Sequence, residues 1–221
     1  MKWNFADNTN QQSLAYQFRF KRFLFFRFLL DKLPKPVSIL DIGGTQDYWN
    51  MMGFSDERIQ ITLLNLEVQP VSGNSFVSVK GDATDLSAYA DRSFDIVYSN
   101  SVIEHLFTKG AQQRMADEVR RVGKNYFIQT PNYYFPVEPH WVFPFFQFLP
   151  VNVRVWMTMH LNLGHIGRIE DRVAAARQVK EVRLLTRQEL QKLFPGAEMY
   201  EERFLGLTKS LVAYQFENFY S

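Results

Sequence analysis

Carboxylates, paired glycines and histidines stand at a few positions where a protein would hold a polar molecule or move a proton. They are Asp41 before Gly43-Gly44, Asp82 after Gly81, Glu104-His105, and His140 after Glu138-Pro139. A carboxylate accepts hydrogen bonds from hydroxyl and amino groups, and an imidazole exchanges protons near neutral pH. Glycine lets the backbone approach a bound group closely because it has no Cβ. We therefore expect a site for a polar ligand with a general base beside it.

Buried strands are predicted just before most of these positions. Apolar runs predict strands at residues 37–42, 59–66, 76–80, 94–99 and 125–130, and an amphipathic helix at residues 111–122. Strands that alternate with helices form a largely parallel sheet covered by helices on both faces. The carboxyl ends of these strands meet at one edge of the sheet, and open α/β sheets bind ligands at that edge.

The two ends of the chain complete the predicted fold. Helices are predicted at residues 13–33 and 186–194, and strands at residues 198–205 and 210–216. Pro34 and Pro36 end the first helix, and Thr186 with Glu189 forms a capping box at the start of the second. The connection between the last two strands is too short for a parallel crossover. We expect an α/β fold with a doubly wound, seven-stranded, mostly parallel sheet that ends in an antiparallel hairpin.

Five segments carry a resemblance in the right order along the chain. They are Val37–Thr45, Gly81–Asp85, Phe94–Leu106, Gln129–Asn132 and Leu185–Leu190. Together they resemble the motifs of class I S-adenosylmethionine-dependent methyltransferases with a type 11 methyltransferase domain. The terminal hairpin is also typical of that family, whereas a dinucleotide-binding sheet is ordinarily all parallel. The resemblance implies S-adenosylmethionine as cofactor and an enzyme that transfers its methyl group.

The resemblance also assigns residues to each part of the cofactor. It gives Asp41, Gly43 and Gly44 to the methionine moiety, Asn65 or Glu67 to the ribose, Asp82 and Ala83 to the adenine, and the backbone at Ser99 and Asn100 to the amino group. Asn65 aligns better by strand position, whereas Glu67 supplies the charge that suits two ribose hydroxyls and is slightly favoured. Either residue can instead lie on the surface.

The cofactor loop departs from the family pattern. Thr45 and Asp47 stand where that pattern has two further glycines. Gly43-Gly44 can therefore be an ordinary strand-to-helix turn, and Asp82 can be a helix N-cap. A catalytically inactive chain that serves as a binding or partner subunit stays an alternative. A nicotinamide-dependent oxidoreductase is disfavoured because the loop lacks the spaced glycines that let a pyrophosphate approach a helix.

The aromatic segment from Tyr133 to Gly167 is expected to form an apolar lid over the methyl acceptor. The residues predicted to bind substrate are Tyr133, Tyr134, Trp141 and Phe145, and the candidate catalytic histidines are His140 as the base and His105 beside the reacting sulfur, with His160 and His165 behind them. Packing within the lid is the alternative for His140. An aromatic pocket favours an apolar or amphipathic small molecule as acceptor.

The N-terminal helix mixes aromatic and basic residues between Tyr16 and Lys32. Such a helix can lie on a membrane surface, and a lipid-linked acceptor would then be favoured. Apolar residues nearly encircle this helix, however, and that pattern is typical of a packed helix. We therefore prefer packing beside the cofactor cleft and keep peripheral membrane contact as the alternative.

Composition limits the remaining possibilities. A chain of 221 residues suits one α/β domain. We divide it into a helical cap (1–36), a cofactor-binding core (37–132), an acceptor lid (133–170) and a C-terminal helix with hairpin (171–221). The net charge of +2 and the lack of a basic stripe favour no nucleic acid partner. Cysteine is absent and the histidines show no tight ligand spacing, so no metal is expected. No leader is apparent, and a cytoplasmic location is the default expectation.

Overall fold

The computed structural model describes residues 10–217 and contains the expected seven-stranded sheet. The strand order is β3-β2-β1-β4-β5-β9-β8. The strands are β1 (Val37–Ile42), β2 (Ile59–Asn65), β3 (Phe76–Lys80), β4 (Phe94–Asn100), β5 (Gly123–Pro131), β8 (Glu198–Phe204) and β9 (Leu207–Gln215). The first five are mutually parallel, whereas β9 runs antiparallel to both β5 and β8. The predicted fold class is therefore confirmed.

The terminal hairpin is tighter than the sequence predicts. Residues Leu205 and Gly206 alone form the turn, and both have positive φ angles, 48° and 82°. Two consecutive residues in this region form the primed turns whose twist matches that of the flanking strands. The second strand consequently begins at Leu207 rather than at Ser210.

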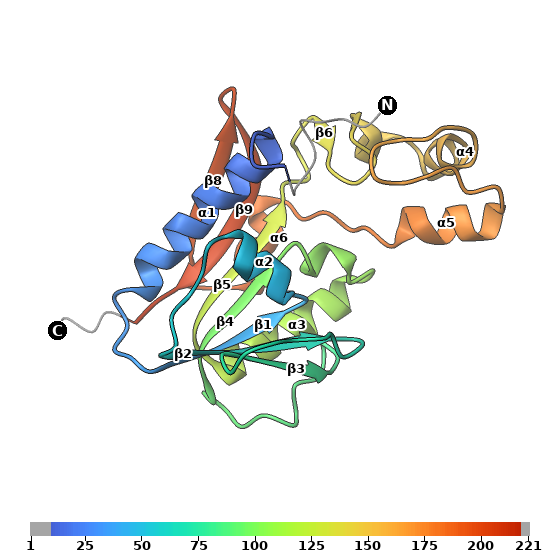
Figure 1. The fold of residues 1–221 in the computed structure, drawn as a ribbon. Helices are drawn as coiled ribbons and strands as arrows, with labels where there is room; N and C mark the ends of the chain where they lie inside the picture. The colour runs from blue at the N-terminus through green and yellow to red at the C-terminus, as the bar shows by residue number, and fades with distance from the viewer. Residues whose placement is uncertain (1–9, 218–221) are drawn as a thin grey trace.

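Helices cover both faces of the sheet (Figure 1). One face carries α1 (Leu14–Leu30) and α2 (Gln46–Met51), and the other carries α3 (Lys109–Val122) and α6 (Arg187–Leu193). Successive side chains of a strand point to opposite faces of the sheet. In β1, Ile39 therefore packs in the layer under α1, and its neighbour Leu40 packs in the layer under α3. The capping box at Thr186 and Glu189 is present as predicted.

The N-terminal helix α1 packs on the sheet, in agreement with the preferred interpretation. Ser13 caps it, and Phe23 and Phe26 are fully buried against the sheet and α2. The outer face nevertheless leaves Leu24 48% and Phe28 57% exposed. Within residues 10–217, no helix is both long and apolar enough to cross a bilayer.

The aromatic segment after β5 folds as a small subdomain that projects from the sheet (Figure 1). Its elements are β6 (Val137–Glu138), β7 (Phe143–Pro144), the 3₁₀ helix η3 (Phe146–Phe148), α4 (Val151–His160) and α5 (Arg172–Lys180). Trp141 stacks on Phe146 in a core that also contains Val155 and Val179. Because α5 packs on α4, it belongs to the subdomain. The subdomain therefore extends beyond residue 170, where the end of the acceptor lid was expected.

Candidate functional site at the carboxyl ends of the strands

Asp41 lies at the end of β1 and is 1% exposed. Its Oδ2 accepts a hydrogen bond of 2.7 Å from the Trp49 indole of α2. Its Oδ1 is buried and has no hydrogen-bond partner among the described residues. Burial raises the pKa of this carboxyl to about 7, because the charged form loses its hydration. Asp41 Oδ1 can thus accept a hydrogen bond from a ligand at the carboxyl edge of the sheet, where open α/β sheets bind ligands.

The Gly43-Gly44 turn has no room for side chains. Gly43 has φ of +76°, and a Cβ there would lie 2.4 Å from Val102 Cγ2. A Cβ on Gly44 would lie 1.7 Å from Asp41 Oδ2. Thr45, one of the departures from the family pattern, caps α2, and Asp47 lies in the first turn of that helix. The loop is therefore tight around Asp41.

Asn65 and Glu67 differ in their positions at the end of β2. Asn65 Nδ2 donates to the Gly44 carbonyl at 2.9 Å, so its side chain contacts the glycine turn. Glu67 has a side chain that is 78% exposed and pairs with Lys80 at 3.0 Å. Asn65 is therefore the one of the two that lies against the first loop.

Asp82 lies in the exposed turn after β3. Its Oδ1 accepts from both the backbone N and the hydroxyl of Thr84, at 2.8 and 2.9 Å. No helix of the described residues follows Asp82 before β4, so it is not the helix N-cap that the sequence offered as an alternative; its side chain instead closes a local turn. Ala83 beside it is buried.

The end of β4 supplies a second unpartnered oxygen. Ser99 is fully buried and donates to the Ile42 carbonyl at 3.2 Å, which ties the ends of β1 and β4 together. Asn100 Oδ1 is buried and has no hydrogen-bond partner in the described part of the chain. Asp41 and Asn100 together thus offer acceptor oxygens on adjacent strands. A ligand rich in N–H and O–H donors would satisfy them.

A cavity of about 330 Å³ opens beside these strand ends, between α1, the sheet and the subdomain. Its wall includes Ser101, Glu104, Gln129 and Pro131 from the strand ends, Phe18, Arg19 and Arg22 from α1, Phe135, Val137, His140 and His165 from the subdomain, and Phe204, Lys209 and Ser210 from the hairpin. The volume suits a small organic molecule. The wall is apolar for much of its extent and carries charged groups at two ends.

One end of the cavity is cationic. Arg22 is 5% exposed and pairs with Glu202 at 3.2 Å, but its Nε has no hydrogen-bond partner within residues 10–217. The ammonium of Lys209 lies 4.8 Å from the Phe18 ring centroid, and burial lowers its pKa to about 8. Burial also lowers the pKa of Arg19. Neither Arg19 nor Lys209 forms an ion pair within the described residues, so this end has excess positive charge.

The other end of the cavity is lined by His140, the predicted base, whereas His105 lies next to His140 but does not line the cavity. His140 Nδ1 lies 2.7 Å from Glu138 Oε1, and Glu138 Oε2 also accepts from the backbone N–H groups of His140 and Trp141. The Nε2 of His140 faces His105 Nε2 at 3.3 Å. Because Glu138 is 2% exposed and fixed by three hydrogen bonds, it fixes the orientation of the His140 ring.

Glu104 lies behind these histidines in η2 (Ile103–His105) and is fully buried. Its Oε2 accepts from the Thr130 hydroxyl at 3.0 Å. Burial raises the pKa of Glu104 to about 7 and lowers the pKa of His105. Burial alone would lower the pKa of His140, but the hydrogen bond to Glu138 and the negative charges of Glu138 and Glu104 together raise it. Several titratable groups thus meet beside the cavity, with Glu104 and His140 in its wall.

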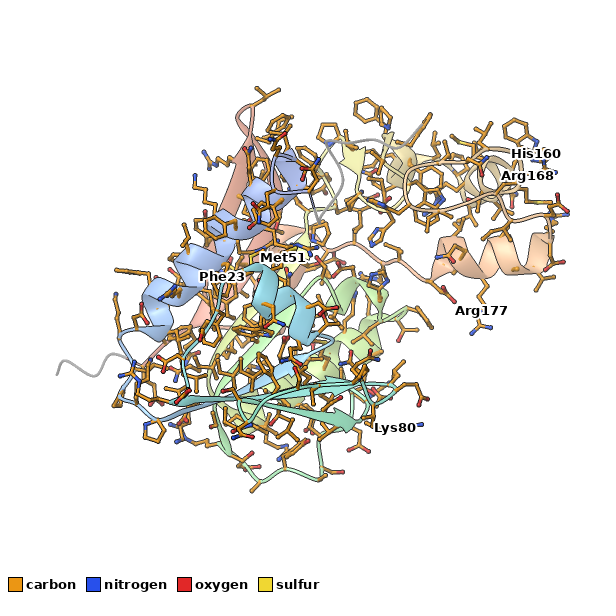
Figure 2. The ribbon with its side chains drawn as sticks, viewed as in Figure 1. Phe23, Met51, Lys80, His160, Arg168 and Arg177 are labelled. Atoms are coloured by element: carbon orange, nitrogen blue, oxygen red, sulfur yellow. The ribbon has the colours of Figure 1, made fainter. Side chains whose placement is uncertain are left out.

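The residues expected to bind substrate are dispersed. Tyr133 and Trp141 line a second cavity of about 430 Å³ between the subdomain and α6, and Glu138 also lines that cavity. Tyr134 and Phe145 are 67% and 56% exposed and do not line either of these two cavities. His160 lies at the outer end of the subdomain, away from the sheet (Figure 2).

Sequence reasoning missed the cationic end and the network that supports it. Gln129 Nε2 donates to Ser210 Oγ at 2.7 Å, and Ser101 Oγ donates to Gln129 Oε1 at 2.8 Å. Arg22 also donates to Ser210. The available signal was a basic residue on the apolar face of α1, because Arg22 is followed at once by the buried Phe23.

Comparison with known families finds one match within the chain. Residues 49–126 match the family described as methyltransferase domain. This segment runs from α2 through β4 to the middle of β5. It contains the strand ends that carry Asn65, Asp82 and Asn100.

Two curated relatives are similar over part of their length. They are the uncharacterized proteins MT1557 and Rv1509 of Mycobacterium tuberculosis strains CDC 1551 and H37Rv, each 35% identical over 139 residues. The match covers 53% of this chain and 43% of each relative. The chain therefore spans less than half the length of the curated relatives it matches.

Solved structures share the fold at low sequence identity. The CurJ carbon methyltransferase gives a TM-score of 0.57 at 10% identity over 95% of this chain and 57% of that one. A SAM-dependent methyltransferase of Methanosarcina mazei gives 0.51 at 15% identity, covering 85% and 94% of the two chains. A SAM-dependent methyltransferase of Aquifex aeolicus gives 0.50 at 12% identity, covering 90% and 91%. At these identities the likeness establishes the fold alone.

Proposed function

We propose that the chain is a class I methyltransferase that transfers a methyl group from S-adenosylmethionine to an amphipathic small molecule. Its fold and the domain match over residues 49–126 support this proposal. The observation that carries this proposal is the cavity of about 330 Å³ at the ends of β4 and β5, which is lined by His140, the histidine that Glu138 orients. A methyl acceptor needs such a place beside the cofactor. The cofactor supplies the electrophilic methyl group, and the chain supplies alignment and proton handling.

The residues at the strand ends fit the cofactor. Asp41 Oδ1 and Asn100 Oδ1 are buried oxygens without partners among residues 10–217, and the ammonium and hydroxyl groups of S-adenosylmethionine are donors. The Gly43-Gly44 turn leaves the backbone bare at the same point. We assign the ribose to Asn65 in preference to Glu67, because Glu67 points to Lys80. Asp82 and Ala83 are assigned to the adenine.

Asp82→Ala is expected to weaken S-adenosylmethionine binding while leaving the fold intact. The exposed carboxylate forms hydrogen bonds only within its own turn among residues 10–217, so its loss removes a ligand contact and two local hydrogen bonds of about 0.5–1.5 kcal/mol each. Asp41→Ala is expected to weaken binding as well, with some loss of stability because Trp49 loses its acceptor. Calorimetric titration measures both variants. Unchanged affinity in both would overturn the placement of the cofactor.

The acceptor is proposed to carry an anionic group. Its apolar part would lie along Phe18, Phe135 and Phe204, and its anion would reach Arg19 and Lys209. Buried cations without counter-charges are costly, and an anion from the ligand would compensate them. The end of the acceptor that receives the methyl group would then lie near His140 Nε2, in agreement with the prediction that His140 is catalytic.

Acceptor binding is expected to weaken as the pH rises through about 8. Lys209 has its pKa lowered to about 8, so it is cationic below that pH and neutral above it. Lys209→Arg keeps its charge throughout this range and should remove the pH dependence. The measurement is S-adenosylhomocysteine formation with paired acceptors that differ only in a carboxylate or phosphate group. Equal use of charged and neutral acceptors at pH 7 would contradict the anionic assignment.

Peripheral membrane contact, and with it a lipid-linked acceptor, is proposed through the exposed face of α1. Leu24 and Phe28 lie one turn apart on that face, and Lys32 lies over the Phe28 ring at 4.1 Å. Sedimentation with phosphatidylglycerol vesicles should decrease for Phe28→Asp, and phosphatidylcholine vesicles serve as the control. Equal sedimentation of variant and parent would remove the membrane proposal and leave the methyl transfer proposal untouched.

The alternative function is that of an inactive binding or partner subunit. Thr45 and Asp47 first suggested it, but both have structural roles in α2 that leave the glycine turn intact. Cofactor binding without methyl transfer to any acceptor in the panel would favour this alternative.

A further inference from the structure

Three donor atoms converge where the sequence spacing indicated no metal. One ligand atom each from Glu104, His105 and His140 lies within 4.8 Å of the others. His105 and His140 are separated by 35 residues along the chain, and the approach of the subdomain to η2 brings them together. Two imidazoles and one carboxylate form the donor set of many catalytic zinc sites, which leave further positions open for a ligand.

The two facing imidazole nitrogens, Nε2 of His105 and Nε2 of His140, require a proton or a cation between them. Glu138 accepts from Nδ1 of His140, so the lone pair of His140 is on Nε2 and points to His105. The His105 ring also forms a hydrogen bond to the Glu181 backbone, and its Nε2 is the atom that faces His140. Two lone pairs at 3.3 Å repel each other unless a proton or a cation lies between them.

Glu104 supplies the negative charge that a cation would need. Its Oε1 is buried and has no hydrogen-bond partner among the described residues, whereas its Oε2 is fixed by Thr130. A fully buried carboxylate oxygen without a partner is rare unless a ligand completes it. Glu104 has no cationic ion-pair partner within residues 10–217.

We propose that Glu104, His105 and His140 bind a divalent transition-metal ion of the zinc type, with open coordination positions toward the acceptor cavity. Glu138 is the outer carboxylate that orients His140, an arrangement common to metal-bound histidines. Mixed nitrogen and oxygen donors suit Zn²⁺ or Co²⁺ better than Mg²⁺ or Ca²⁺, which take oxygen ligands.

This inference rests on the proposed methyl transfer and narrows the acceptor to a hydroxyl compound. The acceptor oxygen binds the ion and releases its proton to solvent water. A lone pair of the resulting alkoxide forms the new O–CH₃ bond while the S–CH₃ bond breaks and its electron pair stays on sulfur. The products are the methyl ether and S-adenosylhomocysteine. The ion makes the hydroxyl acidic enough to react near neutral pH.

The test is titration of the metal-free full chain with Co²⁺, followed by visible absorption, in the absence of S-adenosylmethionine. We expect one ion per chain with the intense bands of low coordination number. His105→Ala and Glu104→Gln should abolish these bands, and Glu138→Gln should weaken binding by about 10–100-fold. His160→Ala is the matched control, because that histidine lies at the outer end of the subdomain (Figure 2) and should bind cobalt like the parent.

Two results would overturn the metal site. One is no cobalt binding by the parent chain, and the other is equal binding by His105→Ala, whose exposed side chain can be removed without disturbing the core. Calorimetry with S-adenosylmethionine on the same samples separates the two proposals. Cofactor binding without cobalt binding rejects the metal alone, whereas cobalt binding without cofactor binding rejects the methyltransferase proposal.

Discussion

His140→Ala is expected to lower kcat for methyl transfer by about 10²–10⁴-fold, whether His140 accepts the acceptor proton itself or holds the ion that makes the acceptor hydroxyl acidic. The Glu138 carboxylate is 2.7 Å from Nδ1 and fixes the imidazole ring, which lines the acceptor cavity. His105 remains nearby in this variant, but its ring forms a hydrogen bond to the Glu181 backbone and is not oriented by the Glu138 carboxylate. The measurement is S-adenosylhomocysteine formation at saturating cofactor.

The affinity for S-adenosylmethionine should change little in this variant, because the cofactor residues lie on other strand ends. His160→Ala provides the matched control and should keep the parent kcat. A His140→Ala enzyme with unaltered kcat would show that the histidine only packs in the subdomain, the alternative that the sequence left open.

Gly44→Ala is expected to abolish measurable cofactor binding and to lower the free energy of unfolding by about 1–3 kcal/mol, the usual cost of overpacking. The new Cβ would lie 1.7 Å from Asp41 Oδ2 and 2.1 Å from its Cγ. Asp41 has little freedom to move away, because it is 1% exposed and bonded to Trp49. Urea denaturation measures the stability, and calorimetry measures the binding.

Gly167→Ala is the control for this substitution. A Cβ at Gly167 meets no atom within 4 Å, so stability and cofactor affinity should both match the parent. If Gly44→Ala binds the cofactor normally, the glycine turn is not part of the cofactor site, and only its structural role remains.

Most of the sheet was predictable because each strand is a short apolar run bounded by turn residues. The predicted bounds of β1 and β3 agree with the structure, those of β2 and β4 differ by one residue at the C-terminal end, and β5 begins two residues earlier and ends one residue later than predicted. Strand order follows from the resemblance and the short terminal connection. The hairpin turn was misplaced since nothing in the sequence marks Leu205 as a residue that adopts positive φ.

The subdomain was harder to predict because its local pattern conflicts with its structure. Valines at 151, 153 and 155 alternate as in a strand, yet they belong to α4. Tertiary packing overrides that pattern, since Val155 and Met157 contact the core built on Trp141 and Phe146. Its aromatic residues were therefore interpreted as an acceptor-site lid, whereas Trp141 and Phe146 serve largely as the subdomain's own core.

The sequence predicted only those site residues whose position depends on a single strand end. Asp41 and Asn100 follow directly from strand positions, but the meeting of His140 with Glu104 depends on how the subdomain lies against η2. The cationic end depends on α1 and the hairpin, which are nearly the whole chain apart, as the Arg22–Glu202 pair shows. Contacts of this kind leave no periodic pattern in the sequence.

The most direct test of the central claim is calorimetric titration of the purified chain with S-adenosylmethionine and S-adenosylhomocysteine, with NADH as the comparison. We predict that both adenosyl ligands bind at one site per chain with affinities in the micromolar range and that NADH does not bind. Binding of NADH, or no binding of either adenosyl ligand, would contradict the assignment of the strand ends as a methyltransferase cofactor site.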